Sequence, residues 1–164
     1  MAGFHTKTFL KYDDYMTPKH AWADIKHLIP NKIIWEAFYG DGKSGEYLKE
    51  LGFETIHEPV DFFECDLGEI IVSNPPFSEI KPILKRLLIL DKPFILILPS
   101  SKINTSYFRE WKDKNIQIII PRRRIHFHKM DENGEILDLP KQCNFDCFYY
   151  CYKMNFEKDI IWLV

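Results

Sequence analysis

The sequence predicts an α/β fold built on a mostly parallel sheet with helices on both of its faces. The first observation is alternation, because segments rich in Ile, Val and Phe are separated by segments with helical spacing along most of the chain. The second is that residues 93–99 are apolar at every position, which is typical of a central strand buried on both faces. In such a sheet, ligands bind beyond the carboxyl ends of the strands.

The composition restricts the class of protein. The chain has 164 residues, a formal net charge of −2 and 46% hydrophobic residues. These values predict one domain spanning 1–164 and exclude a protein that holds nucleic acid through bulk positive charge. No apolar run reaches the roughly 18 residues of a membrane span, and residues 1–14 lack the apolar core of a signal peptide. We therefore expect a protein of the cytoplasm or of a host nucleus, neither secreted nor bound to a membrane.

The N-terminal half predicts a helix followed by a strand, a glycine-rich loop and a second helix. Thr17 followed by Pro18 is typical of a helix start, and apolar residues at helical spacing extend the prediction to a helix at about 18–29. The elements that follow are a strand at 32–38, a glycine-rich loop at 40–45, a short helix ending near residue 51 and a strand at 53–57.

The C-terminal half continues the alternation. Ser78 is a candidate cap for a helix whose apolar positions, from Ile80 to Leu88, repeat at helical spacing. The other predicted elements are strands at 69–73, 93–99, 116–120 and 145–152, a helix at 105–114 and an irregular stretch at 130–142.

Three of the four cysteines lie close together near the C-terminus. Cys143, Cys147 and Cys151, with His126 and His128 upstream, form a candidate zinc cluster. Structural zinc sites, however, are mostly built from C-x2-4-C pairs of cysteines. The spacing of four also gives residues of one face of a buried strand. We therefore predict free thiols and no metal site.

The glycine-rich loop follows a predicted strand, where a ligand is expected. A blank turn is an equally ordinary interpretation of a lone Gly-x-Gly. A phosphate cradle of the Walker type is excluded, because Ala37 stands at the position of its first glycine. ATP hydrolysis is therefore not expected.

A more specific motif, Asn74-Pro75-Pro76-Phe77, follows the predicted strand at 69–73. Two successive prolines after a buried strand make the backbone rigid. The Asn74 amide oxygen and the Pro75 carbonyl can accept hydrogen bonds from a planar amino group, and Phe77 offers a stacking face for a base. The alternative is a tight turn with Phe77 in the core.

In this context, Asn74 to Phe77 resembles the catalytic motif of amino-methylating methyltransferases that use S-adenosyl-L-methionine. Residues 15–18, 36–42, 61–63, 73–77 and 124–127 together resemble small adenine-specific methyltransferases of phages and large DNA viruses. The similarity extends over most of the chain, from about Tyr15 to Tyr152. It implies a Rossmann-like class I methyltransferase fold with a seven-stranded sheet, adenine N6 as acceptor and DNA as the usual substrate.

The resemblance also implies roles for single residues. In the catalytic motif, Asn74 and Pro75 hold the amino group and Phe77 stacks on the base. Asp61 resembles the acid that receives the amino group of the cofactor's adenine, and Glu58 fits the ribose-binding acid by position. Thr17 and Pro18 match a motif that closes the methionine end of the site, although they can equally be a simple helix cap. The residues implied around the cofactor are Tyr15, Thr17, Pro18, Glu36, Phe38, Gly40, Asp41, Gly42, Glu58, Asp61 and Phe62.

The strongest local positive charge lies at 122–129, after the predicted strand at 116–120 and hence near the same edge of the sheet. Such a run is often only a solvated segment, but its position beside the proposed site favours contacts to phosphates. The predicted nucleic-acid contacts are Lys102, Arg122, Arg123, Arg124 and His126.

Three functions compete. The first is a DNA adenine N6-methyltransferase. The second is an RNA base or protein glutamine methyltransferase, against which the arginines favour nucleic acid over protein. The third is a non-catalytic module that binds cofactor or nucleic acid. Because no separate recognition domain fits into 164 residues, we expect sequence specificity to come from loops such as 130–142, from a second copy of the chain in a homodimer, or from another partner.

Overall fold

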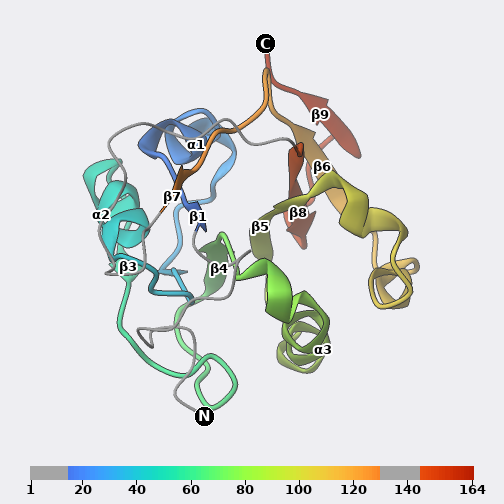
Figure 1. The fold of residues 1–164 in the computed structure, drawn as a ribbon, viewed down its shortest axis with the longest axis horizontal. Coiled ribbons are helices and arrows are strands. Elements are labelled where there is room, and N and C mark those ends of the chain that lie inside the picture. The colour runs from blue at the N-terminus through green and yellow to red at the C-terminus, as the bar shows by residue number, and fades with distance from the viewer. Residues whose placement is uncertain (1–14, 130–144) are drawn as a thin grey trace.

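A computed structural model describes residues 15–129 and 145–164 of the chain (Figure 1). The predicted loop 130–142 and Cys143 lie outside the described residues. The main feature is an open seven-stranded sheet, and its strands are, in spatial order, β3 (Thr55–Ile56), β2 (Ile34–Trp35), β4 (Ile70–Ser73), β5 (Phe94–Pro99), β8 (Cys147–Tyr152), β6 (Gln117–Ile120) and β9 (Ile160–Trp162).

The sheet is mixed but mostly parallel. Four of the six neighbouring pairs are parallel, and the two antiparallel pairs both involve β8, which lies between β5 and β6. In Figure 1 the strands from the first part of the chain form one half of the sheet and those from the last part form the other. The predicted α/β class with a mostly parallel sheet is therefore confirmed at this level.

Alternate residues of the strands join two separate hydrophobic clusters. Ile95 and Ile97 of β5 belong to a cluster that also contains residues of helices α1 (Lys19–Ala23) and α2 (Lys43–Glu50). Leu96 of β5 belongs to a second cluster that contains residues of α3 (Ile80–Leu90). This partition follows from the period of two along a strand, which sends neighbouring side chains to opposite faces.

Two strongly patterned predictions agree with the structure. β5 is buried along its whole length, as the unbroken apolar run predicts. The predicted helical spacing after residue 80 forms α3, whose positions Ile80, Ile83, Leu84 and Leu87 are buried. Ser78 is not the N-cap residue of this helix, a position that Glu79 occupies. Ser78 lies in a 3-10 turn at Phe77–Glu79, and α3 has no side-chain cap.

One helix prediction is too long and another is wrong. The helix expected at 18–29 is only α1, followed by a 3-10 turn at Lys26–Leu28, because Ile25 leaves the helical conformation with φ −113° and ψ 9°. Pro18 precedes α1 without any side-chain cap from Thr17. The helix expected at 105–114 is instead a 3-10 turn whose buried residues, Phe108 and Trp111, are three positions apart, the period of that helix.

Three short strands were not predicted. β9 forms one edge of the large sheet, and β1 (Tyr15–Met16) pairs antiparallel with β7 (His128–Lys129) in a separate two-stranded ribbon. This ribbon joins two segments that are more than a hundred positions apart in the sequence. The predicted strand at 145–152 is confirmed as β8, where Cys147 and Cys151 are buried on the same face and form no disulfide with each other.

Candidate functional site

The order of strands brings three loops to one edge of the sheet. β4 lies between β2 and β5, and all three run in the same direction. Their carboxyl ends therefore lie side by side. The glycine-rich loop follows β2, Asn74 to Phe77 follows β4, and a 3-10 turn at Ser100–Asn104 follows β5. The motif after β4 consequently has the glycine-rich loop on one side and the turn after β5 on the other.

Asn74 is hydrogen-bonded to β1 and has a side-chain oxygen that accepts no hydrogen bond from the described residues. Its Nδ2 donates a hydrogen bond to the backbone oxygen of Tyr15 at 3.3 Å. Its Oδ1 is buried and has no hydrogen-bond partner among the described residues. An unsatisfied buried acceptor costs about 1–3 kcal/mol, which a donor from a ligand would offset. The geometry around Asn74 therefore fits a ligand that carries an N–H or O–H group.

Four aromatic rings pack together at the Asn74-Phe77 motif. Tyr15 stacks on Phe77 with ring centroids 6.2 Å apart and an interplanar angle of 25°. Phe127 and Phe145 contact both of these rings edge-on. Pro75 is buried, and Pro76, with φ −63°, leads directly into the turn that begins at Phe77. The structure therefore gathers Tyr15 and the whole Asn74-Phe77 motif into one cluster.

The glycine-rich loop is closely packed against β1. Gly40 has φ +60°, in the region that favours glycine, and an added Cβ would lie 3.2 Å from the Met16 sulfur. Gly42 has φ +85° and precedes α2. Asp41 accepts a hydrogen bond from the Lys43 backbone N–H at 3.0 Å through Oδ1, while its Oδ2 is buried without a partner among the described residues. The loop thus presents tight backbone and one unused carboxylate oxygen.

Glu36, predicted beside the cofactor, is bound on both carboxylate oxygens by the protein itself. Oε1 accepts hydrogen bonds from the Ser73 hydroxyl and from the Phe38 backbone N–H, and Oε2 accepts one from the Ser44 hydroxyl at 2.5 Å. Only 1% of Glu36 is exposed. Burial raises its pKa to about 7, even though the bonds from Ser44 and Ser73 act in the opposite direction.

The Glu36 contacts form a longer chain of hydrogen bonds. Trp22 Nε1 donates to the Ser44 hydroxyl at 2.8 Å, so the chain runs from Trp22 through Ser44 and Glu36 to Ser73. Ser73 immediately precedes Asn74, so this chain holds the strand end that carries the motif. The sequence interpretation gave no role to Trp22, Ser44 or Ser73, although Ser44 lies in the glycine-rich loop and Ser73 in the segment 73–77 that carries the resemblance.

After β3, the predicted ribose-binding residue Glu58 and its neighbour His57 have different surroundings. Glu58 is exposed, whereas His57 is half-buried and stacks on Tyr39 at 4.7 Å and 23°. A Cβ at Gly45 would lie 2.1 Å from the His57 ring, so Gly45 allows this ring to pack against α2. Burial lowers the pKa of His57. The proximity of a histidine and a glycine from different loops had no signal in the sequence.

Asp61 and Phe62 have different surroundings. Asp61 Oδ1 accepts a hydrogen bond from the Phe63 backbone N–H at 2.9 Å. Phe62 is 1% exposed and packs on Phe38 and Trp35, with centroid distances of 4.8 and 5.6 Å. Its ring therefore belongs to the core in this structure, while Phe63 is half-buried beside it. Thr17 and Pro18 are also buried.

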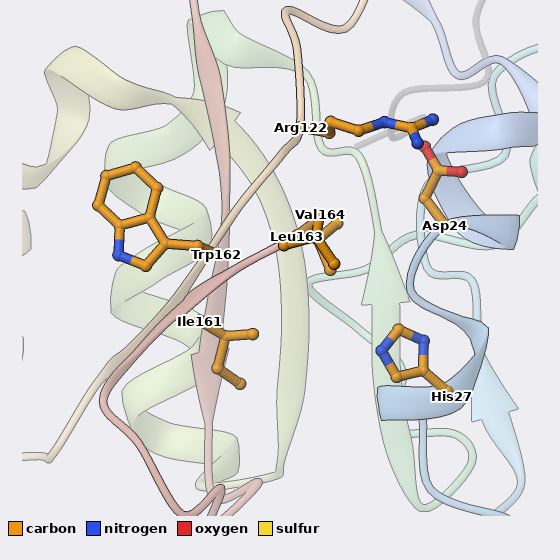
Figure 2. Close-up of a pocket in the computed structure, with 7 residues that line it drawn as sticks. All are labelled: Asp24, His27, Arg122, Ile161, Trp162, Leu163 and Val164. Carbon is orange, nitrogen blue, oxygen red and sulfur yellow. The ribbon is translucent and has the colours of Figure 1, made fainter.

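The five predicted nucleic-acid contacts are not brought together. Arg124 binds Asp146 through Nε at 2.8 Å and Nη2 at 3.1 Å, and these bonds hold the pKa of Asp146 below its usual value. Arg122 lines a cavity of about 190 Å³, where it points toward Asp24 (Figure 2). Arg123 is exposed and His126 half-buried.

Lys102, in contrast, lies in a larger cleft of about 500 Å³ beside the Asn74 motif. This volume is within the range of about 300–1,000 Å³ that small-molecule sites occupy. The sequence interpretation missed Lys81 and Tyr107, because neither belongs to a motif. The residues that line the cleft are Phe77, Ser78, Lys81, Pro99, Ser101, Lys102, Tyr107 and Phe145.

No protein-family model, curated protein or solved structure matches the chain. Within residues 15–129 and 145–164, no group of three or more His, Cys, Asp or Glu side chains is arranged to hold a metal ion. In the same part of the chain, no helix has both the length and the apolar character that crossing a membrane requires. The function must therefore be inferred from the geometry of the chain itself.

Proposed function

We propose that this protein is an S-adenosylmethionine-dependent methyltransferase that transfers a methyl group to adenine N6 in DNA. The observation that carries the proposal is Asn74, whose buried amide oxygen has no partner among the described residues. It lies between a tight glycine-rich loop and a cleft that contains Lys102. A methyl-transfer enzyme must hold the donor methyl and the acceptor nitrogen close together, and Asn74 is placed where a cofactor and an acceptor can meet from opposite sides.

The loops after β2 and β3 fit the cofactor. Gly40 and Gly42 have positive φ angles, and Met16 and Tyr39 fill the space that a Cβ at each would need, so the loop backbone has a fixed shape against which a cofactor can bind. The buried Asp41 Oδ2 can accept a hydrogen bond from an amino or hydroxyl group. When bound, S-adenosylmethionine supplies an activated methyl group on a sulfonium centre. Tyr15, Thr17, Gly40, Asp41, Gly42 and Asp61 would hold it, while Glu36 supports their loop from behind.

The Asn74 motif fits the acceptor. Its amide oxygen accepts one hydrogen of the adenine amino group, and the Pro75 carbonyl accepts the other. These two bonds turn the nitrogen lone pair toward the donor and fix its distance, which accounts for much of the rate gain in a direct transfer. Phe77 offers its ring to the base. The surrounding rings keep water out of the site.

Two features of the fold support a Rossmann-like arrangement of the methyltransferase type. The strands on each side of β4 continue in parallel, and helices α1 and α2 contribute to one core cluster whereas α3 contributes to the other. Helices on both faces of the sheet would produce this partition. We include the Rossmann-like fold in the proposal on that basis.

The cleft favours a nucleic acid over a protein glutamine as acceptor. Its described lining contains two lysines and three aromatic rings but no carboxylate. Stacking surfaces combined with cations are typical of sites for polynucleotides. A non-catalytic binding module would have no need for the polar clamp at Asn74.

The proposal is tested by incubating the protein with methyl-labelled S-adenosylmethionine and separate pools of DNA, RNA and protein. We expect label in DNA, on adenine N6, and none with Asn74→Ala. The matched control is Asn104→Ala, which removes an exposed amide bonded to Arg109. Label only in RNA or protein, or equal labelling by the two variants, would contradict the proposal.

A further inference from the structure

The cleft beside Asn74 has two lysines that no acid neutralises. Lys81 lies in the first turn of α3, and Lys102 lies in the turn after β5. Within the described part of the chain, no Asp or Glu lines the cleft and neither lysine forms an ion pair. Lysines that are not paired within the protein are available to bind phosphate groups of a ligand.

Two of the three arginines after β6 are directed elsewhere, whereas Arg123 is exposed. Arg124 is engaged with Asp146 through two nitrogens, and Arg122 points into a different cavity toward Asp24 (Figure 2). The net charge of the whole chain is −2. A protein that grips duplex DNA commonly uses about 6–10 phosphate contacts. Lys81, Lys102 and Arg123 together are fewer than the cations that such a grip uses.

The number of phosphate contacts matters because they must offset the energy needed to turn a paired base out of a duplex. Turning an adenine out of a duplex costs a few kcal/mol, which an enzyme must recover through contacts to the rest of the DNA. A single strand has no such cost, and each of its bases can stack on an aromatic ring. Phe77, Tyr107 and Phe145 supply three rings in the cleft next to Lys81 and Lys102.

We propose that the cleft binds one unpaired polynucleotide strand, with Lys81 and Lys102 as its phosphate contacts, so that the methyl acceptor is an adenine outside a base pair. This inference rests on the proposed methyl transfer to adenine and specifies the form of the substrate. It also reassigns phosphate binding from the arginines at 122 and 124 to the lysines of the cleft.

Binding is tested by fluorescence anisotropy with a labelled adenine-containing DNA strand over a range of salt concentrations. Two phosphate contacts predict a slope of log K against log salt of about −1.4, and Lys81→Ala or Lys102→Ala each reduces its magnitude by about 0.7. The matched control is Lys32→Ala, an exposed lysine in the loop before β2. If both cleft variants keep the salt slope of the wild type, the proposal is overturned.

Catalysis is tested with the same sequence as a single strand, as a full duplex and as a duplex with the target adenine bulged. We expect kcat/KM on the order of 100-fold higher for the single strand and the bulge than for the full duplex, since unpairing costs a few kcal/mol. If kcat/KM on the full duplex equals that on the single strand, the inference is overturned, but the proposed methyltransferase activity is not contradicted. Lysine-dependent binding of the strand without methyl transfer to any substrate supports the cleft and contradicts the proposed function instead.

Discussion

The two sides of β4 differ in packing. On the side of β2, Met16 contacts Gly40 closely, and Glu36 uses both carboxylate oxygens to hold Ser44 and Ser73. On the side of β5, the surface opens into a cleft of about 500 Å³ with two lysines. A tight, prearranged side is suited to one small molecule of fixed shape, whereas an open charged side is suited to a segment of a polymer. Asn74 lies at the boundary between them.

The largest effect is expected at this boundary. Asn74→Ala removes the amide oxygen that accepts the amino group, and loss of one such positioned group lowers the rate by about 100-fold or more. The side chain does not belong to the proposed cofactor site, so calorimetry is expected to give a nearly unchanged Kd for S-adenosylmethionine. If Asn74→Ala kept the wild-type kcat, or lost affinity for S-adenosylmethionine together with kcat, the assignment of Asn74 to the acceptor and not to the cofactor would be contradicted.

A change on the tight side is expected to act on the cofactor. Gly40→Ala places a side chain at φ +60°, which strains the loop backbone, and its Cβ lies 3.2 Å from the Met16 sulfur, which must give by a few tenths of an ångström. We expect the affinity for S-adenosylmethionine to fall about tenfold, which corresponds to about 1.4 kcal/mol. The measurement is calorimetric titration.

Gly52→Ala provides the matched control for Gly40→Ala. Gly52 has φ +101°, yet an added Cβ would meet nothing within 4 Å. Both variants suffer backbone strain, but only Gly40→Ala has a steric contact with the site. An equal loss of cofactor affinity in the two variants would assign the effect to strain alone.

Glu36 predicts a pH dependence of stability. Burial raises its folded-state pKa from 4.5 to about 7, so the folded protein retains a proton that the unfolded chain releases between these values. Stability therefore falls as pH rises through this window, by up to about 3 kcal/mol. Glu36→Gln cannot titrate and should lose this part of the dependence.

Urea unfolding of Glu36→Gln at pH 5 and pH 8 measures the effect described above. The control is Glu110→Gln, which removes an exposed carboxylate in the turn at Phe108–Trp111. We expect the free energy of unfolding of the control to change with pH as that of the wild type does. An identical pH dependence in Glu36→Gln and wild type would show that Glu36 titrates normally.

The smallest effect is expected from Arg124→Ala. Because Asp146 already occupies this guanidinium, its removal should leave the affinity for a DNA strand and the salt slope unchanged. The sequence-based interpretation predicts the opposite, since it counted Arg124 among the phosphate contacts. Measuring the affinity of Arg124→Ala and of Lys102→Ala for the same DNA strand distinguishes the two interpretations. A larger loss of affinity in the arginine variant would favour phosphate binding by the basic segment at 122–129.

The sequence was informative where one physical pattern dominates a long segment. The apolar run at 93–99 allowed only a buried strand, and the helical spacing after Ile80 allowed only a helix with one buried face. The motif at Asn74 could be placed at the end of a strand for the same reason. In each case, local pattern and tertiary packing agree.

The parts that the sequence did not predict depend on contacts between distant segments. β1 and β7 have two residues each, too short for any periodicity, and they exist because they pair with each other. The change of Arg124 from a predicted phosphate contact to a partner of Asp146 likewise depends on the start of β8, next to Asp146, lying beside the segment after β6. Charge density along the chain does not reveal which cations are already paired.

The central claim is that Asn74 holds an adenine amino group between the two sides of β4. The most direct measurement is mass spectrometry of nucleosides from a DNA strand that has been incubated with S-adenosylmethionine and either wild type or Asn74→Ala. We predict N6-methyldeoxyadenosine with the wild type and a loss of at least about 100-fold with the variant. Methylation at another base or position, or equal N6-methyldeoxyadenosine from both proteins, would contradict the claim.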